Sequence, residues 1–419
     1  MKKILALVVL SLFVASSYAQ ELSFENLHFY GEGSFNGFIY ENSTLNTSEI
    51  YNVSGTGMYL TIGLRLDIYE DIIASFALGY TNMWGDGSEW SGRPLNGNRG
   101  LIDLFKIVEA NMLFNNLFDV DGLSFKIGRQ YYGDEDSTVV YIGIRRNQPL
   151  YIVIGAADVP GTIGAISSID AAAAYYDKDN IKANLIYGIM ENRGADGNRT
   201  LIGGDFKYLN IAEILDLQGY LYNFENYVSA QDHYTILGVK PTVKIKGLKA
   251  SLEVAKNFGG EESLSNETFN TNFIKADASY VIENLKLTPR VSLGVFGGEN
   301  KPFITIGNCS AGLIVSRVLI NGNYSDNRII NTGVDYEFKK FVFSFDIFSY
   351  DSRDGEDLKN NVKFGTEFDL TAKCAYAENI DFYFGIGHLF GADFSKFKNG
   401  GKDSFDSSTL QAGITYKFN

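Results

Sequence analysis

The chain of 419 residues carries a formal net charge of −14 and contains 44 Gly, 26 Tyr, 31 Phe, 6 Pro and 2 Cys. The acidic balance argues against nucleic acid as a partner and against docking onto anionic lipid. Two cysteines do not imply a disulfide framework, and Cys309 and Cys374 are interpreted as unpaired thiols. Many Gly and aromatic residues with few Pro favour long antiparallel strands over disorder.

The N-terminus has the features of an export signal. Lys2 and Lys3 precede an apolar run over residues 4–14, and Ser17-Tyr18-Ala19 supplies small residues where a signal peptidase reads. We therefore predict a signal peptide over residues 1–19 and a single barrel domain over residues 20–419. No later segment has the roughly eighteen consecutive apolar residues of a spanning helix, so periplasm, medium or outer membrane remain as destinations.

Alternating side chains begin between Met58 and Tyr69. One face takes Leu60, Ile62, Leu64, Leu66 and Ile68, and the other takes Thr61, Gly63, Arg65, Asp67 and Tyr69. A period of two predicts a strand with one apolar face. About 18 segments of this kind recur. They lie near 26–40, 55–69, 72–83, 102–114, 122–131, 167–176, 180–191, 199–208, 213–225, 233–246, 248–258, 271–282, 285–297, 329–338, 340–350, 362–376, 379–390 and 408–418.

The connections between these segments fall into two classes. Short ones hold Glu70-Asp71, 177–179, Lys246-Gly247, Lys339-Lys340 and Ala377-Glu378, whereas long polar ones cover 82–100, 259–270, 298–328, 351–361 and 391–407. Short and long connections alternate along the chain, as in a transmembrane barrel with short periplasmic turns and long extracellular loops. The sequence therefore predicts an all-β fold: one closed antiparallel barrel of about 18 strands in the outer membrane of a diderm bacterium.

The final strand ends its apolar face at Phe418, one residue before the terminus. A terminal aromatic strand is similar to the motif that the barrel-insertion machinery recognises, so this machinery and outer-membrane lipid are the expected partners.

Several motifs resemble the alginate-export family of outer-membrane porins. They are Lys126-Ile127-Gly128-Arg129-Gln130 followed by Tyr132-Gly133-Asp134-Glu135, then residues 289–294 (PRVSLG), 365–370 (GTEFDL) and 387–391 (GHLFG). The resemblance implies passive passage of an anionic polysaccharide through an arginine-rich lumen.

The inward charges predicted from strand parity are mixed rather than basic, which leaves the solute open. The cations are Arg65, Lys182, Lys207, Lys249, Lys275, Lys286, Arg290, Lys363, Lys373 and Lys417. The anions are Glu32, Asp67, Glu109, Asp205, Asp216, Glu253, Asp277, Asp335, Glu337, Asp346, Glu367, Asp369 and Asp381.

The third outer loop, residues 132–167, is too apolar for a solvated loop. It contains Val139, Val140, Tyr141, Ile142, Ile144, Leu150, Ile152, Val153 and Ile154. We predict that it folds into the lumen as a constriction, where facing rows of opposite charge select solutes. The alternative is a surface hairpin with ordinary solvated charges.

Catalysis has little support in the sequence. His28, His233 and His388 are far apart, no pair has metal-ligand spacing, and residues 351–357 miss the calcium-loop pattern. We predict a non-enzymatic channel without cofactor or metal for the passive diffusion of small or anionic and saccharide solutes.

The predicted contacts along the solute path are two sets of charged residues. The cations are Arg65, Arg129, Arg145, Arg146 and Arg290, and the anions are Asp134, Glu135 and Asp136. Arg129 has the parity of the apolar face, so its inclusion requires a bulge. A surface antigen or adhesin barrel with a plugged lumen is the alternative function, and a secreted soluble β-protein is a third hypothesis. The sequence does not indicate an oligomeric state.

Overall fold

The computed structural model describes residues 26–41, 53–85, 103–134, 137, 139–144, 162–163, 166–191, 198–226, 234–261, 268–297, 327–353, 361–392 and 405–418. The predicted signal peptide and four predicted path residues lie outside these ranges: Glu135, Asp136, Arg145 and Arg146. None of the helices in the described ranges is long and apolar enough to cross a membrane.

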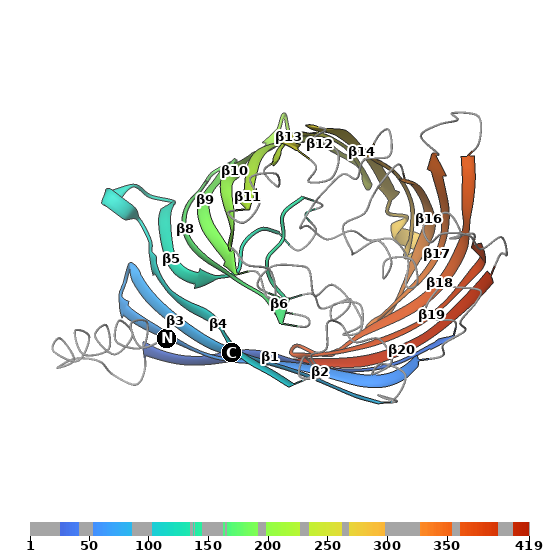
Figure 1. Ribbon diagram of the computed structural model, residues 1–419, viewed down its shortest axis with the longest axis horizontal. Coiled ribbons are helices and arrows are strands. Elements are labelled where there is room, and N and C mark those ends of the chain that lie inside the picture. The colour runs from blue at the N-terminus through green and yellow to red at the C-terminus, as the bar shows by residue number, and fades with distance from the viewer. Residues whose placement is uncertain are drawn as a thin grey trace.

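The strands form one closed, 18-stranded antiparallel sheet around a lumen (Figure 1). Each barrel strand pairs with the next barrel strand along the chain. The first strand, β1 (Leu27–Glu41), pairs with the last strand, β20 (Phe405–Phe418), and this pairing completes the ring. This confirms the predicted fold class and strand number.

The predicted segments agree with the observed strands to within a few residues. The barrel strands are β1 (Leu27–Glu41), β2 (Val53–Tyr69), β3 (Ile72–Gly85), β4 (Asp103–Phe114), β5 (Leu123–Gln130), β8 (Ile169–Lys178), β9 (Ile181–Glu191), β10 (Asn198–Ile211), β11 (Leu215–Asn226), β12 (Tyr234–Ile245), β13 (Leu248–Glu261), β14 (Thr268–Tyr280), β15 (Leu287–Phe296), β16 (Asn327–Phe338), β17 (Phe341–Arg353), β18 (Asn361–Ala377), β19 (Ile380–Ala392) and β20 (Phe405–Phe418).

The two faces of the sheet differ in polarity. On β2, Ile62 is 48% exposed on the outside, whereas its neighbour Thr61 is 4% exposed on the inside. Outward side chains of β17 and β19 are likewise apolar, among them Phe343, Phe345 and Phe384. The alternation follows from the pleat, which sends successive side chains to opposite faces. The barrel therefore has an apolar outer surface, and its inner face has polar and charged side chains together with a buried apolar cluster.

Tight turns close one end of the barrel. Lys246 and Gly247, which form the turn between β12 and β13, have φ of 41° and 85°. Two positive φ values are what a two-residue hairpin needs to match the twist of its strands. The other end of the barrel carries the longer connections, so the predicted sorting of short and long connections is present in the fold.

A short hairpin between β5 and β8 was not predicted. It consists of β6 (Thr162–Ile163) and β7 (Ile166–Ser167), and β6 contacts β3 and β4. In Figure 1 it lies inside the ring of strands. Two-residue strands carry too little alternation to be recognised in a sequence.

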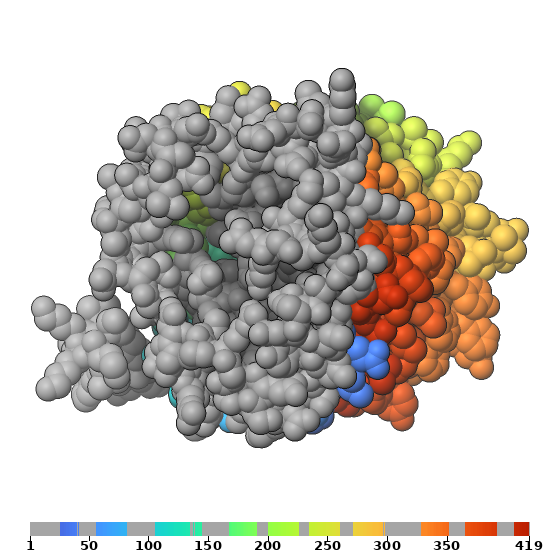
Figure 2. Space-filling view, turned by 45° about the vertical axis from the view of Figure 1, so that its right-hand side comes forward, coloured from blue at the N-terminus to red at the C-terminus, as the bar shows by residue number. Residues whose placement is uncertain are grey.

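The seam between the first and last strands joins a glycine to an aromatic ring. Gly31 on β1 is the register partner of Phe418 on β20. A Cβ added at Gly31 would lie 2.2 Å from the Thr61 carbonyl oxygen and 2.5 Å from Cζ of Phe418. The Phe418 ring thus covers the glycine. In Figure 2, blue atoms from the N-terminal strands lie directly against red atoms from the last strands.

We expect Gly31→Ala to lower the free energy of unfolding by about 1 to 3 kcal/mol, because the new methyl group overpacks the seam. Urea unfolding in lipid vesicles, followed by Trp fluorescence, measures this change.

Gly37→Ala is the matched control on the same face of β1. Its nearest neighbour, Cγ2 of Thr56, lies 3.9 Å away, which is an ordinary contact. Equal unfolding midpoints for the two variants would contradict a specific role for the Gly31–Phe418 contact.

Candidate functional site

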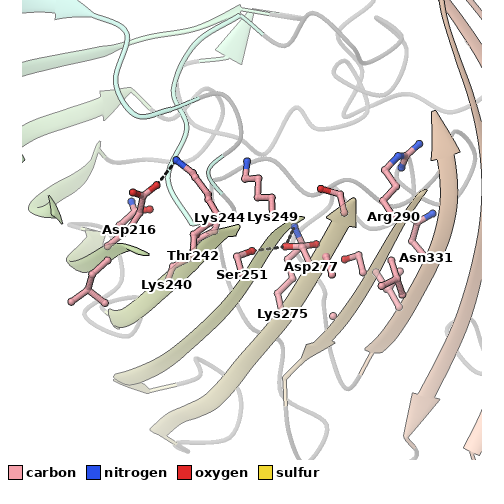
Figure 3. A pocket seen from close by; sticks show the side chains of 18 of the residues that line it. Asp216, Lys240, Thr242, Lys244, Lys249, Ser251, Lys275, Asp277, Arg290 and Asn331 are labelled. Carbon is pink, nitrogen blue, oxygen red and sulfur yellow. Dashed lines mark hydrogen bonds and ion pairs between the residues drawn. The ribbon is translucent and has the colours of Figure 1, made fainter. Parts of the chain in front are cut away.

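A cavity of about 530 Å³ lies in the lumen against the wall formed by β10 to β17 (Figure 3). Its cations are Lys207, Lys240, Lys244, Lys249, Lys275 and Arg290, and its anions are Asp216, Asp277 and Asp346. The strands place these side chains inward at alternate positions. Cations outnumber anions among the lining residues, although three of the cations pair with the carboxylates of Glu253, Asp335 and Asp134 just outside the lining.

Ion pairs neutralise part of this charge. Lys244 Nζ lies 2.6 Å from Oδ2 of Asp216, and Lys275 Nζ lies 3.2 Å from Oδ2 of Asp277. Lys240 Nζ is 3.7 Å from Oε2 of Glu253, a carboxylate that is 3% exposed. Lysines held in this way retain further donor positions, because an ammonium group has three hydrogens.

Lys249 differs from these lysines. It is exposed to the lumen and makes no ion pair or hydrogen bond with the described part of the chain. It is the register partner of Lys244, so two ammonium groups project inward from directly opposite positions of β12 and β13. Like charges in direct opposition repel, and the Asp216 carboxylate, which is paired with Lys244 and interacts electrostatically with Lys249, relieves part of that repulsion.

Arg290 is already held by protein carboxylates. Its guanidinium group donates two hydrogen bonds of 2.8–2.9 Å to Asp335 and two more of 2.8–2.9 Å to Asp346. Asn331 also donates to Asp346, at 2.9 Å. Arg290 therefore lies in the cavity wall, but both sides of its guanidinium group already donate hydrogen bonds to aspartates. Its main effect is to neutralise two inward aspartates.

Arg65 lies on the inner face of β2, away from the lysine cavity. Its Nε is 3.0 Å from Oδ1 of Asp67, and Nε2 of His28 is 3.3 Å from the other oxygen of that carboxylate. Arg65 and Arg290, which were both predicted to contact the solute, thus lie on separate parts of the lumen wall.

Arg129 lies on the outer face of the barrel. Its Nε and Nη2 donate to Asp170 at 2.6 and 2.5 Å, and it shares the face of Ile127, which is 48% exposed. The bulge required to turn it inward is absent from β5, whose register with β8 is continuous over 123–130. The hypothesis that Arg129 lines the solute path is therefore wrong.

The described part of the third loop packs against the inner wall. Tyr132, Val139, Val140 and Ile142 are buried in one cluster with inward residues of β8 to β12. The Tyr132 hydroxyl lies 3.2 Å from that of Tyr222. Burial raises the pKa of the Tyr132 phenol, which keeps this hydroxyl protonated.

Asp134, at the start of the loop, forms an ion pair with Lys207 of β10. This is the only member of the predicted acidic row that falls in the described ranges. The contact joins the loop to the edge of the lysine cavity.

Buried carboxylates face the lumen from another arc of the barrel. Glu32, Glu109, Glu367 and Asp369 are at most 8% exposed. Tyr30 donates to Glu109 at 2.8 Å and Tyr350 to Glu367 at 2.9 Å. Tyrosine hydroxyls thus bind carboxylates on this arc, whereas carboxylates on the arc of the lysine cavity are paired with lysines and with Arg290.

Sequence reasoning missed Lys126, Lys240 and Lys244 as inward-facing residues. Lys240, Thr242 and Lys244 do alternate, but Ile236 and Tyr234 at the top of the same face are apolar and fully or nearly buried. When one face of a strand changes from apolar to charged along its length, the alternation of side chains does not indicate which face points into the lumen.

Among the described residues, no group of three or more His, Cys, Asp or Glu side chains is placed to hold a metal ion.

No protein-family model matches the sequence, and none of the curated proteins does. The alginate-export resemblance therefore stays a prediction.

Solved structures do match the fold. OccAB3 of Acinetobacter baumannii superposes with a TM-score of 0.60 at 12% identity, over 93% of this chain and 99% of that one. OccK8 (OprE) of Pseudomonas aeruginosa has a TM-score of 0.57 at 13% identity, over 93% and 98%. OpdK of Pseudomonas aeruginosa with vanillate has a TM-score of 0.58 at 10% identity, over 93% and 98%. At these identities the likeness shows the shared 18-stranded barrel alone.

We expect Arg290→Ala to lower the free energy of unfolding by about 2 kcal/mol, because it leaves Asp335 and Asp346 facing each other without a cation. This value allows for the partial exposure of the arginine, 28%. Urea unfolding in vesicles measures it.

Lys249→Ala is the control from the same cavity. It removes a cation that no described carboxylate pairs with, so we expect a change within about 0.5 kcal/mol. An equal loss of stability in both variants would show that Arg290 does not stabilise the wall through its aspartates.

Proposed function

We propose that this protein is a passive outer-membrane channel that conducts small organic anions, among them carboxylates and acidic saccharides. The observation that carries the proposal is the lysine cavity inside a closed barrel, with Lys244 and Lys249 opposed across two strands. Cations that line a water-filled path raise the local concentration of anions.

The lysine cavity suits transient rather than tight binding. Lys244, Lys275 and Lys240 each keep a carboxylate neighbour, so an arriving anion competes with protein groups at every step. Conduction requires sites that attract a solute and then release it. No energy source or cofactor is needed for movement down a gradient.

The third loop, residues 132–167, is the proposed constriction. Its described residues are packed on the inner wall of β8 to β12, and Asp134 reaches Lys207 beside the lysine cavity. A solute would then pass between this loop and the basic wall. Arg145, Arg146, Glu135 and Asp136 remain proposed contributors to the charge of the constriction.

One of the related folds offers a probe molecule. The OpdK structure contains vanillate, an aromatic carboxylate. Chloride is the test anion for selectivity in the experiment below, and block of the chloride current by added vanillate would report entry of an organic carboxylate.

The proposal includes export to the outer membrane and removal of residues 1–19. The intact mass of the protein isolated from outer membranes should correspond to residues 20–419. A mass that retains residues 1–19 on the membrane-embedded chain would contradict cleavage after Ala19.

We expect reproducible conductance steps for the detergent-purified protein in a planar bilayer. Reversal potentials in a potassium chloride gradient should show anion preference. Lys249→Glu should lower the anion-to-cation permeability ratio at least twofold, because it reverses the sign of the exposed cation in the cavity.

Lys256→Glu makes the same charge change on the same strand. Lys256 shares the outward face of β13 with Leu252 and Val254, so we expect its permeability ratio to equal that of the wild type. Cation preference of the wild type would contradict the anion route. A folded barrel without conductance steps would favour the display of surface loops over transport.

A further inference from the structure

Arg129 and Asp170 form an ion pair on the outer surface of the barrel wall. The register of β5 and β8 sets these two residues opposite each other, and both Asp170 oxygens accept from the guanidinium group at 2.5 and 2.6 Å. Their neighbours on the same face are apolar, including Ile127 at 48% and Ile189 at 37% exposure.

The Arg129–Asp170 pair is unusual because it lies on the outer face at the height of the apolar belt. Arg129 is six residues from the start of β5, and Asp170 is eight residues from the end of β8. Tilted strands climb roughly 2.5 Å per residue, which places the pair about 15 to 20 Å from the short-turn end. The apolar belt of a transmembrane barrel is about 25 Å tall. Further toward the loop end, Phe105 of β4 is 67% exposed on the same face.

Lipid does not satisfy such a pair, because charged groups on the lipid face of a barrel are destabilising at this depth. Asp170 remains 52% exposed after binding Arg129, so its carboxylate has acceptor positions to spare. A protein surface that brings hydrogen-bonding groups would satisfy both residues.

The surroundings of the pair are self-complementary in shape and charge. Leu185 and Tyr187 of β9 protrude, with exposures of 66% and 51%. Their register partners on β8 are Ala174 and Ala172, which leave a flat floor beside them. A two-fold interface needs matching features within one patch. This patch contains both signs of charge, projecting side chains and a floor that accepts them.

We propose that the outer face of β5, β8 and β9, centred on Arg129 and Asp170, binds the same face of a second copy of this chain within the membrane. The inference rests on the membrane location in the proposed function, but not on conductance. In this dimer, Arg129 of one copy and Asp170 of the other are buried in the same interface. Leu185 and Tyr187 of each copy pack on Ala172 and Ala174 of the other.

Cysteine cross-linking in native membranes tests the interface. In a Cys309→Ala, Cys374→Ala background, Leu185→Cys should give at least ten times more dimer with a short bis-maleimide than Leu252→Cys. Leu252 is the matched control, because it is 45% exposed on the outer face of β13. Heat-modifiable migration on gels verifies that each barrel is folded. Equal, low cross-linking of two folded variants overturns the proposal.

A second set of variants tests the charge pair itself. Arg129→Leu with Asp170→Leu, added to Leu185→Cys, should reduce the dimer at least tenfold. Arg328→Leu with Asp351→Leu is the matched control, because that ion pair lies on the outer face at the loop end of β16 and β17. Undiminished dimer without the Arg129–Asp170 pair overturns its role.

Carbonate washing of the same membranes separates the two proposals. A chain released by the wash overturns the membrane location and with it the proposed function. A chain that stays embedded and fails to cross-link overturns only the interface.

Discussion

Pairing between β1 and β20 is the constraint on which the rest of the structure depends. Inside a membrane no water satisfies the backbone groups of an open edge, so a sheet must close on itself. Closure fixes which side of every strand faces the lumen, and it does so for all 18 strands together. The Gly31–Phe418 contact lies at this seam, where a side chain from the last strand fills the space that a glycine leaves on the first. The position of each lumen charge follows from this closure.

Inward charges in this barrel are arranged mostly as satisfied groups, and the exceptions are informative. Arg290 lies between two aspartates, and Tyr350 donates to Glu367, so these groups contribute to the stability of the wall. Lys249 makes no hydrogen bond or close ion pair with a described carboxylate, interacts electrostatically with Asp216, and projects beside Lys244. A charge that adds nothing evident to stability and increases repulsion is a better indicator of function than a paired one. This distinction is the reason why we propose a solute path along the lysine cavity rather than at the arginines.

The fold could be predicted from the sequence because the alternation of side chains recurs in about 18 strands, and because short and long connections alternate between them. The site could be predicted only in part. The parity of the strands predicts inward positions for Arg290 and Lys249, but the hydrogen bonds from Arg290 to Asp335 and Asp346 depend on how neighbouring strands pair, which parity does not give. Parity was also correct for Arg129, because the bulge that an inward position required is absent from β5. Lys240 and Lys244 were missed because the face that carries them is apolar near its other end.

The third loop and the outer ion pair both lie at the loop end of β5. This strand has 8 residues, whereas its neighbours β4 and β8 have 12 and 10. Because β5 ends at Gln130, the chain turns inward early, and Tyr132 and Ile142 pack on the inner wall. The same early end leaves Arg129 and Asp170 at the top of their strands yet still within the apolar belt. A wall that is short where the loop enters thus has polar groups on its outer side that lipid does not satisfy, and the proposed constriction inside and the proposed contact outside lie at the same place in the barrel.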